Sequence, residues 1–372
     1  METKRVALVH DWMTGMRGGE KILEIFCEMF PAATLFTLVH KKGALSPSIE
    51  RMHIETSFIQ NLPRATTHYQ KYLPLFPAAI EQLNVKDFEL VISTSHAVAK
   101  GVIPHAGAQH LCYINTPMRY VWDMYEQYVN PQKLHGIGGT ITRAAAPHIA
   151  TYLRMWDASS CNRVDRFVAN SRNVQRRVWR HYRRESDVIY PPVETASFPF
   201  SPEHDGYDLL LGAMVPYKRF DLAIEAYNAL GHKLIVMGSG PEEKSLRRLA
   251  GSNITFLPPQ SQSQLMQLYA RSRFLVFPGE EDFGIVPLEA QSCGKPVVAF
   301  GRGGALETVV DSETGVYFDE QSVECLCEAV KLAEATDWDA AAIRAHSLKF
   351  DSAIFKAKIG DYIALHAGEK PE

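Results

Sequence analysis

Short apolar segments alternate with amphipathic segments along the first half of the chain. Residues 20–30 and 173–182 repeat apolar positions at helical spacing. The segments with the continuous apolar pattern of strands buried on both faces of a parallel sheet are 5–10, 34–39, 90–95, 111–115, 167–169 and 188–189. Strands that alternate with helices in this way predict a doubly wound α/β domain.

A proline pair interrupts this pattern in the middle of the chain. Pro191 and Pro192 favour extended backbone, and residues 192–207 are polar, as expected of an interdomain connection. The alternation then restarts, with predicted strands at 208–214, 234–237, 254–257, 274–277, 296–300 and 316–318, and predicted helices at 220–230, 242–250, 264–271, 323–335, 338–346 and 352–366. We therefore predict an α/β fold of two doubly wound domains, residues 1–191 and 192–351, that face each other across a cleft.

The composition is that of a globular protein. Hydrophobic residues make up 46% of the 372 residues and charged residues 22%, and the net charge of −3 gives no overall attraction to nucleic acid. No apolar run is long enough to span a bilayer, and the first predicted strand begins too early for a signal peptide, so we expect a cytoplasmic protein. The six cysteines lack metal-ligand spacing, which favours reduced thiols and no metal site.

Residues 281–289 place two carboxylates, Glu281 and Glu289, between a predicted strand and an apolar helix start. In an open parallel sheet, loops at the carboxyl ends of the strands line the ligand crevice. Two carboxylates in such a loop suit either general acid–base catalysis or recognition of ligand hydroxyl groups. The residues alone leave both interpretations open.

Three glycine-rich loops, at residues 15–20, 238–241 and 301–304, could contact an anion through backbone N–H groups. Lys218 and Arg219 follow the first strand of the second half, where two cations suit a diphosphate. None of the loops has a Walker motif or a complete dinucleotide-binding motif. Ordinary turn geometry is therefore the competing interpretation for the glycines.

Several motifs together resemble the retaining family-4 glycosyltransferases, which have the GT-B fold. Besides Glu281 and Glu289, the matching stretches are Gly18-Gly19, Ser93-Thr94-Ser95-His96, Thr116-Pro117-Met118-Arg119-Tyr120, Ala169-Asn170-Ser171 and Val215-Pro216-Tyr217-Lys218-Arg219. Residues 116–123 look most like bacterial mannosyltransferases that build surface or lipid-linked polysaccharides. The resemblance covers essentially the whole chain and implies that a C-terminal helix, residues 352–368, packs back on the first domain.

The resemblance implies roles for the charged residues of the second domain. Glu289 is expected to bind the ribose of a nucleotide-sugar donor, and Glu281 the hydroxyl groups of the transferred sugar. Lys218, together with Arg219, is expected to neutralise the diphosphate leaving group. In the family's usual account the departing phosphate takes the acceptor proton and the anomeric configuration is retained, so no metal or other cofactor is expected. The resemblance therefore favours recognition over acid–base catalysis for the two carboxylates.

Backbone and first-domain contacts are implied as well. The backbone of Phe283, Gly284 and Ile285 is expected to approach the sugar and the phosphates, and Gly18 and Gly19 to close the donor site from the first domain. The sequence departs from the family at two places. Asn115 stands where relatives usually have a histidine that approaches the transferred sugar, and Gly212-Ala213 stand where many relatives have an arginine. Asn115 is expected to keep a sugar contact, because its amide can donate and accept hydrogen bonds.

The acceptor side and the ligands are less closely defined. His10 and Asp11 end the first predicted strand, and with Arg119 they are the acceptor-side candidates, although a structural His–Asp contact is the alternative for the first two. The expected donor is GDP-mannose, with a UDP-hexose as the alternative, and the expected acceptor is a glycan on a lipid carrier. A non-catalytic nucleotide-sugar binder and a phosphorylase or epimerase of similar build stay open.

A basic stretch between Arg163 and Arg184 contains eight arginines and one acidic residue, Asp165. Such a stretch can rest on anionic lipid, with about 1 kcal/mol gained for each basic residue near the surface. It would bring the protein to the inner face of the membrane and to a lipid-linked acceptor. A solvated helix face with locally paired charges is an equally good interpretation.

Overall fold

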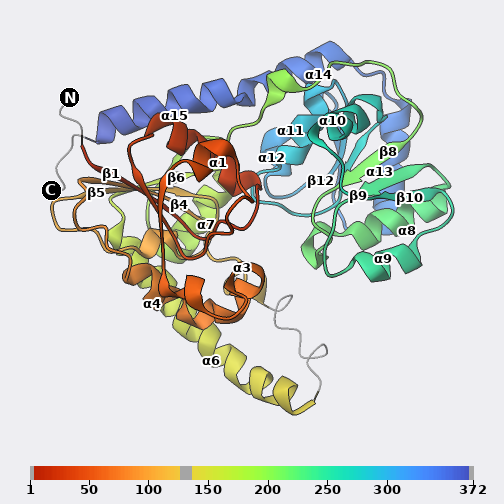
Figure 1. Ribbon diagram of the computed structural model, residues 1–372. Coiled ribbons are helices and arrows are strands. Elements are labelled where there is room, and N and C mark those ends of the chain that lie inside the picture. The colour runs from red at the N-terminus through yellow and green to blue at the C-terminus, as the bar shows by residue number, and fades with distance from the viewer. Residues whose placement is uncertain (1–3, 126–135, 368–372) are drawn as a thin grey trace. The chain divides into compact units, whose positions relative to one another are not determined.

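The structure is a computed structural model that describes residues 4–125 and 136–367, with side chains of the helix at 136–160 described from residue 145 onward. The chain forms two compact units. The first contains residues up to Tyr190 together with residues from Lys356 onward, and the second contains Pro191–Phe355. Each unit is built on its own parallel sheet, as the alternation of strands and helices predicts (Figure 1).

The first unit has a seven-stranded sheet in the order β3-β2-β1-β4-β5-β6-β7, and all of its pairings are parallel. The strands are β1 (Val6–His10), β2 (Thr34–Thr37), β3 (His53–Thr56), β4 (Leu90–Ser95), β5 (Gln109–Ile114), β6 (Arg166–Ala169) and β7 (Asp187–Val188). Strands β4 and β5 are buried at every position, which explains their continuous apolar pattern.

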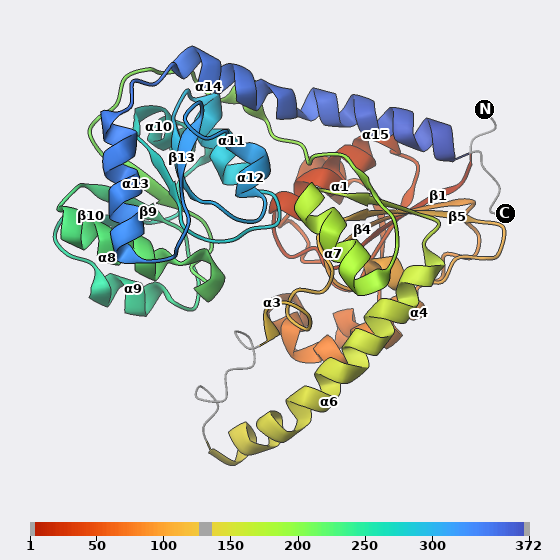
Figure 2. The ribbon, with the colours of Figure 1, turned by 180° about the vertical axis from the view of Figure 1, so that it is seen from behind.

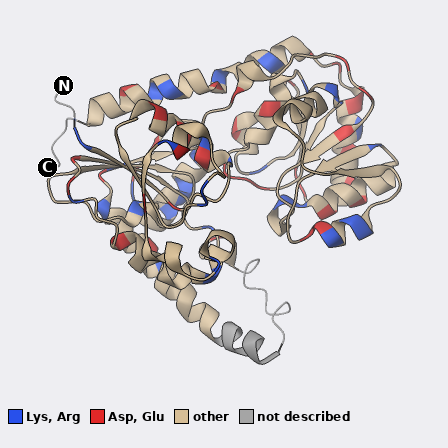
Figure 3. Cartoon of the chain, viewed as in Figure 1, with Lys and Arg blue, Asp and Glu red and all other residues tan. Residues whose placement is uncertain are grey.

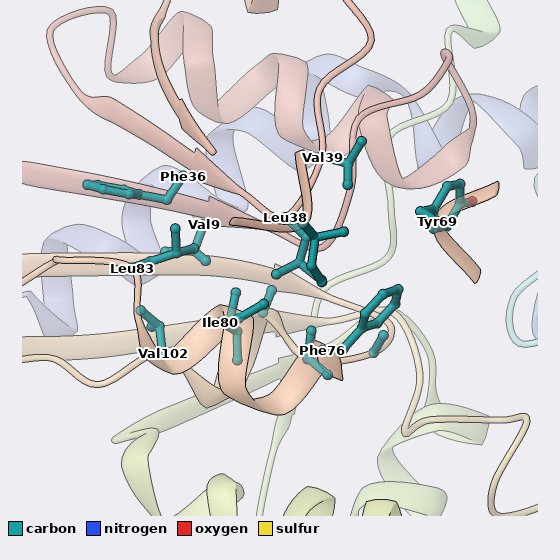
Figure 4. Packing of buried hydrophobic residues seen from close by; sticks show 14 of the residues in the cluster. Val9, Phe36, Leu38, Val39, Tyr69, Phe76, Ile80, Leu83 and Val102 are labelled. Carbon is teal, nitrogen blue, oxygen red and sulfur yellow. The ribbon is translucent and has the colours of Figure 1, made fainter. Parts of the chain in front are cut away.

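Helices cover both faces of this sheet. They are α1 (Gly18–Met29), α2 (Pro47–Glu50), α3 (Ala65–His68), α4 (Phe76–Glu81), α6 (Gly136–Ser160), α7 (Arg172–Tyr182) and α15 (Ser352–His366). Helices α1 and α15 lie on one side of the sheet and α4 and α6 on the other (Figures 1 and 2). Side chains of β1 and β2 point toward those of α4 in the core on that second side, among them Val9, Phe36, Phe76 and Ile80 (Figure 4).

Helix α15 joins the first unit from the far end of the sequence. Ile359 and Ile363 are buried on it, whereas Leu365 is exposed. Lys356 forms an ion pair of 3.2 Å with Glu28 of α1, and the Tyr362 hydroxyl donates a hydrogen bond of 2.8 Å to Asp187 of β7. The last helix is therefore held to the first unit by both apolar and polar contacts.

The second unit has a six-stranded parallel sheet in the order β10-β9-β8-β11-β12-β13. Its strands are β8 (Asp208–Leu211), β9 (Leu234–Met237), β10 (Ile254–Leu257), β11 (Leu275–Phe277), β12 (Val297–Phe300) and β13 (Gly315–Phe318). Its helices are α8 (Phe220–Leu230), α9 (Glu243–Leu249), α10 (Gln262–Arg271), α11 (Ile285–Ser292), α12 (Ala305–Thr308), α13 (Val323–Ala335) and α14 (Ala340–Ser347). Buried residues of β9, β12, α8 and α13 form one apolar core.

Most predicted elements of the two units are confirmed, but several expectations were incomplete or wrong. Strand β3, the long helix α6 and the short helices α2, α3 and α4 were not predicted, and the predicted strands 34–39 and 208–214 end earlier, at Thr37 and Leu211. The predicted helix at 338–346 begins later, at Ala340, because the Asp339 carboxylate accepts hydrogen bonds from the N–H groups of Ala341 and Ala342. The predicted connection at 192–207 is partly ordered on the second unit, where Phe198 is buried in the core.

The strand order creates a crevice position in each sheet. Strand order reverses between β1 and β4 in the first unit and between β8 and β11 in the second. Ligands of doubly wound sheets bind outside the carboxyl ends of the strands at such switch points. The sites are therefore expected beyond His10 and Ser95 in the first unit, and beyond Leu211 and Phe277 in the second.

Candidate functional site

The residues singled out in the sequence fall into two groups, one at the switch point of each unit. Glu281, Lys218 and their neighbours follow β11 and β8 in the second unit. His10, Asp11, Gly19 and Asn115 follow or face the ends of β1 and β5 in the first unit.

Lys218 and Glu281 meet at the switch point of the second unit. The Nζ atom of Lys218 lies 2.8 Å from Oε1 of Glu281, and the two side chains are 13% and 20% exposed. The pair is therefore partly shielded but open to a ligand. The Lys218 side chain lies over Gly212, where a Cβ atom would come within 3.0 Å of Nζ. Gly212 belongs to the pair of residues that stand where many relatives have an arginine. Because it has no side chain, it leaves room for Lys218.

Glycines bring the loops around this pair into close contact. A Cβ atom on Gly304 would lie 2.2 Å from the carbonyl oxygen of Phe283, and the Gly304 N–H donates a 2.8 Å hydrogen bond to the Glu281 carbonyl. A Cβ atom on Gly238 would lie 1.8 Å from the carbonyl oxygen of Gly212. Both glycine loops therefore support neighbouring loops by close packing, which accounts for these glycines without a bound anion.

Glu289 has a buried partner. It lies on α11 and is 8% exposed, and its Oε2 atom accepts a hydrogen bond of 2.6 Å from the hydroxyl of Tyr269 on α10. Burial, together with the nearby Glu289 charge, raises the pKa of Tyr269 well above its ordinary value, so this hydroxyl stays a donor. Tyr269 was not predicted, because its contact joins two helices that are separate in sequence.

The turn between Glu281 and α11 is buried at Phe283 and Gly284. Phe283 is 3% exposed and its ring lies 5.9 Å from that of Phe350. Gly284 has a φ of 99°, in the left-handed region that favours glycine, and α11 begins at Ile285. The first N–H groups of a helix have no acceptor within it, so α11 can offer the N–H of Ile285 to a ligand, whereas Phe283 and Gly284 precede the helix.

Arg219 is placed differently from Lys218. Its guanidinium donates hydrogen bonds of 3.1–3.2 Å to the carboxylate of Asp221 and one of 3.1 Å to Gln321. Gln321 in turn donates to the carbonyl of Pro278. Arg219 thus links the start of α8 to the end of β11, and this favours a supporting role over direct contact with a diphosphate.

Gly19, His10 and Asn115 cluster in the first unit. A Cβ atom on Gly19 would lie 3.6 Å from the His10 ring and 3.7 Å from Nδ2 of Asn115. His10 is fully buried, and its Nδ1 atom lies 2.6 Å from Oγ1 of Thr94. Among the described residues, neither Nε2 of His10 nor Nδ2 of Asn115 has a hydrogen-bond partner. Gly18 is the first residue of α1 and directly precedes Gly19.

Asp11 and Arg119 do not join that cluster in the way expected. Asp11 is fully buried, and its carboxylate accepts four backbone hydrogen bonds from residues 96–99. This favours a structural role for Asp11 over acceptor contact. The predicted contact of Asp11 with His10 is replaced by one with His96, at 3.0 Å. Arg119 is half-buried in the turn after β5.

Two ionisable residues of the first unit, Glu20 and His96, were absent from the predicted site. Glu20 on α1 is buried, with Oε1 3.9 Å from Nε2 of His10. Burial alone would raise the pKa of Glu20, but its contacts with His10 hold it below its ordinary value, so Glu20 stays ionised. The parallel topology explains where both residues lie. It brings the ends of β1 and β4 together, His96 directly follows β4, and Glu20 lies on α1, the first helix after β1.

The arginines between 163 and 184 divide into two sets. Arg163 pairs with Glu81, Arg177 with Asp123, and Arg184 donates to the carbonyls of residues 161 and 164. The exposed set comprises Arg172, Arg176 and Arg180 on α7, next to Trp179, which is 53% exposed, together with Arg166 on β6 and Arg183 just after α7. Basic and acidic residues are otherwise spread over both units (Figure 3). The exposed basic surface of this stretch is thus smaller than its eight arginines suggest.

Two features are absent from the described residues, 4–125 and 136–367. No helix in these ranges is both long enough and apolar enough to cross a membrane. No cluster of three or more histidine, cysteine or acidic residues in them has the arrangement of a metal site.

The family match described next covers the part of the chain that contains the Lys218–Glu281 pair. Residues 196–347 match the family described as glycosyl transferases group 1. This group 1 region includes Lys218, Glu281, Glu289 and Tyr269. The D-inositol 3-phosphate glycosyltransferase of Mycolicibacterium smegmatis is 28% identical over 241 residues, which are 55% of either chain. The chain therefore spans about half the length of the curated relatives it matches.

Solved structures extend the likeness of the fold beyond the group 1 region. The sucrose-phosphate synthase of Thermosynechococcus elongatus superposes with a TM-score of 0.71 and 17% identity, covering 99% of this chain and all of the other. The HepE protein of Anabaena, solved in complex with UDP-glucose, gives a TM-score of 0.68 and 17% identity over 97% and 99% of the two chains. At this identity the likeness concerns the fold alone. It confirms the predicted GT-B class of two Rossmann-like units.

Proposed function

We propose that this chain is a glycosyltransferase that moves a hexose from a nucleotide-sugar to a glycan acceptor. The observation that carries the proposal is the Lys218–Glu281 pair at the switch point of the second unit, inside the group 1 region. A cation and a carboxylate 2.8 Å apart offer adjacent contacts for a diphosphate and for sugar hydroxyl groups. Such fixed charges stabilise a departing diphosphate and an oxocarbenium-like sugar.

In this proposal each residue of the second unit has one task. The Lys218 ammonium binds the diphosphate, and the Glu281 carboxylate accepts hydrogen bonds from the transferred sugar. Glu289 binds the ribose hydroxyls while Tyr269 holds the carboxylate in place from the buried side. The backbone at residues 283–285 contacts sugar and phosphates. No metal ion or other cofactor takes part, and the anomeric configuration is retained, as the family resemblance implies.

The first unit contributes the remaining contacts. Gly19 lies beside Asn115, whose Nδ2 atom is buried without a hydrogen-bond partner among the described residues, and in this proposal that amide contacts the transferred sugar. We expect Asn115→Ala to lower turnover, because the sugar loses a positioning contact. Unchanged turnover and donor affinity would contradict this role. A Gly18→Ala variant is not a control here, because Gly18 belongs to the same site.

GDP-mannose is the proposed donor and a UDP-hexose the alternative. The motif at residues 116–123 favours mannose, whereas the likeness to HepE, whose structure holds UDP-glucose, favours the alternative. The proposed acceptor is a saccharide on a lipid carrier in the synthesis of a bacterial surface polysaccharide. The exposed arginines of α7 are proposed to bring the protein to the anionic inner face of the membrane.

A thermal-shift panel of nucleotide-sugars tests the donor. A ligand present at 100 times its Kd stabilises the folded state by about 2.7 kcal/mol, so GDP-mannose should raise the unfolding temperature more than UDP-glucose does. Release of free nucleoside diphosphate, measured with and without added saccharide, then separates the functions. Release that requires an acceptor supports transfer. Saturable binding without release supports a non-catalytic binder and contradicts the enzyme.

A further inference from the structure

A pocket lies in the first unit at the edge of the sheet opposite the switch point. Its lining comes from the start of β6, from α7, from the loop between α7 and β7, and from α15, and all of these residues belong to the first unit. The starts and ends of parallel strands lie at opposite edges of a sheet, and the four residues of β6 alone span about 13 Å. The pocket is therefore separate from the residues at the switch point.

The size of this pocket is that of a ligand site. Its volume is about 830 Å³, within the range of small-molecule sites in proteins. Three of the described residues that line it are aromatic, and they are Phe167, Trp179 and Tyr362. Phe167 is buried and Tyr362 half-buried, whereas Trp179 is 53% exposed. An exposed tryptophan offers a ligand a broad ring whose electron-rich face attracts C–H groups.

Two arginines pack on these rings. The Arg184 guanidinium lies 5.5 Å from the centroid of the Phe167 ring, and the Arg183 guanidinium lies 6.0 Å from that of Trp179. Arg184 also donates hydrogen bonds to the carbonyls of residues 161 and 164. Arg184 is thus a fixed part of the pocket, whereas Arg183 is exposed at its tryptophan side.

The charges of the pocket balance. Of the described residues that line it, three are acidic and three are basic, namely Asp165, Glu185, Asp187, Arg166, Arg183 and Arg184. A phosphate or another anion would meet three carboxylates beside the three guanidinium groups, whereas anion sites are lined by charges of one sign. The balance therefore favours an uncharged ligand.

The polar groups of the pocket suit a ligand with hydroxyl groups. Carboxylates only accept hydrogen bonds and guanidinium groups only donate them, so a ligand that matches both needs groups that do both, as hydroxyls do. The Oγ atom of Ser186, in the loop before β7, is buried without a hydrogen-bond partner among the described residues. Such an unpaired hydroxyl is costly, and a hydrogen bond from a bound ligand would remove the cost.

We propose that this pocket is a saccharide-binding site for an uncharged hexose unit of a glycan. The C–H face of the hexose packs on the Trp179 ring. Its hydroxyl groups donate hydrogen bonds to Glu185 and accept them from Arg183. The role of the site rests on the glycosyltransferase function proposed above: it holds a part of the acceptor glycan away from the reacting end and so raises the local concentration of that acceptor.

Titration calorimetry with mannotriose and with maltotriose, without any donor, tests the site. Trp179→Ala removes the exposed ring and Arg183→Gly removes the guanidinium. Arg183 has a φ of 55°, in the left-handed region that favours glycine, so Arg183→Gly should not destabilise the fold. We expect each variant to weaken trisaccharide binding by about ten-fold or more, as loss of a central tryptophan or arginine contact does.

Tyr152→Ala and Arg64→Gly are the matched controls. Tyr152 is a 46% exposed aromatic residue of α6, and Arg64 is an exposed arginine whose φ is also 55°. Neither residue lines the pocket, so both variants should bind the trisaccharides as the wild-type protein does.

Kinetics with acceptors of different length then test the role in transfer. Trp179→Ala should raise the KM for an acceptor of several hexoses by about ten-fold, because that glycan loses its second contact. The KM for methyl α-mannoside and kcat should not change, because a single hexose cannot occupy the pocket and react at the same time. An equal rise of KM for both acceptors would overturn the proposed role.

The remaining outcomes separate this inference from the proposed function. Equal trisaccharide binding by all four variants, or no binding to the wild-type protein at millimolar concentration, would overturn the saccharide site and leave the proposed function standing. Displacement of the trisaccharide by inorganic phosphate would indicate an anion site and overturn the inference as well. If the wild-type protein releases no nucleoside diphosphate with any donor, the proposed function fails, whereas trisaccharide binding that requires Trp179 and Arg183 still supports the site.

Discussion

At the scale of single residues, Glu281 and Glu289 have different environments, so their substitution should have different effects on binding and turnover. Glu289 is nearly buried and held by Tyr269, whereas Glu281 is 20% exposed and pairs with Lys218. We expect Glu289→Ala to weaken binding of the nucleoside diphosphate by about ten-fold or more, because hydrogen bonds to a charged group contribute about 1.5–3 kcal/mol. We expect Glu281→Ala mainly to lower turnover, because the Glu281 carboxylate contacts the sugar while it is being transferred. Isothermal titration and steady-state kinetics measure the two effects.

Tyr269→Phe is the companion to Glu289→Ala. It removes the 2.6 Å hydrogen bond but keeps the ring in the core. It should weaken nucleotide binding less than Glu289→Ala does. Equal losses of nucleotide affinity in Glu281→Ala and Glu289→Ala would contradict the division of roles between the two carboxylates.

His110 should make the first unit sensitive to acid. It is fully buried in β5, with Nε2 2.8 Å from Oγ of Ser93 and Nδ1 2.9 Å from the carbonyl of Arg163. Burial lowers the pKa of His110 to about 4 from 6.5. Above pH 6.5 the ring is neutral in both the folded and the unfolded chain. As the pH falls from 6.5 to 4, only the unfolded chain takes up the proton, so the unfolding free energy should fall by about 3 kcal/mol.

Urea unfolding at pH 7 and pH 4.5 measures this effect. His110→Gln removes the titrating group and should show a smaller loss of unfolding free energy between the two pH values, whatever its stability at pH 7. His53→Gln, which alters an exposed histidine, is the control and should lose as much as the wild-type chain. Identical losses in all three proteins would show that His110 is protonated in the folded state.

At the scale of elements, the continuously apolar strands were predictable, whereas the mostly exposed strand β3 at the edge of the first sheet was not. Strands β4, β9 and β10 begin and end where the sequence pattern places them. Strand β3 was missed because it pairs only with β2 and lies mostly exposed, so its residues His53 and Glu55 carry no apolar signal. Helix α6 was missed because it contains Pro147 and several glycines near its start, which are signals for loops.

The candidate sites show the same limit. Lys218 and Glu281 could be found because each follows a predicted strand, and the rule for switch points brings such positions together. Their partner residues could not be found, because Tyr269 reaches Glu289 across two helices and Asp11 reaches His96 across two strands. These contacts depend on the order of the strands in each sheet. The pattern of apolar residues along the chain does not reveal that order.

Helix α15 offers a test of how an element far along the chain stabilises the first unit. Ile363 is 7% exposed and Leu365 is 67% exposed on the same helix. Ile363→Asp buries a charge without a partner and should cost at least about 3 kcal/mol, whereas Leu365→Asp should change stability by about 0.5 kcal/mol or less. Tryptophan fluorescence reports this unit, because Trp12, Trp122, Trp156 and Trp179 belong to it and only Trp338 to the other. Equal stability of the two variants would mean that α15 is not packed in solution.

At the scale of the whole molecule, the net charge of −3 opposes binding to an anionic membrane, so any attraction has to be local. The exposed arginines of α7, with Trp179 between them, form the surface that could supply it. We expect the protein to float with vesicles that contain anionic lipid and to be released by high salt, because screening weakens exposed charges.

A pair of charge-matched variants separates this local surface from the total charge. Arg176→Glu with Arg180→Glu changes the net charge by −4, from −3 to −7, and so does Arg247→Glu with Arg248→Glu on α9 of the second unit. Loss of two basic residues from a membrane-facing surface removes about 2 kcal/mol, or about thirty-fold in the binding constant. The α7 variant should therefore lose flotation, and the α9 variant should keep most of it. Equal losses would mean that total charge governs binding, and flotation of the α7 variant at wild-type levels would exclude α7 as the contact surface.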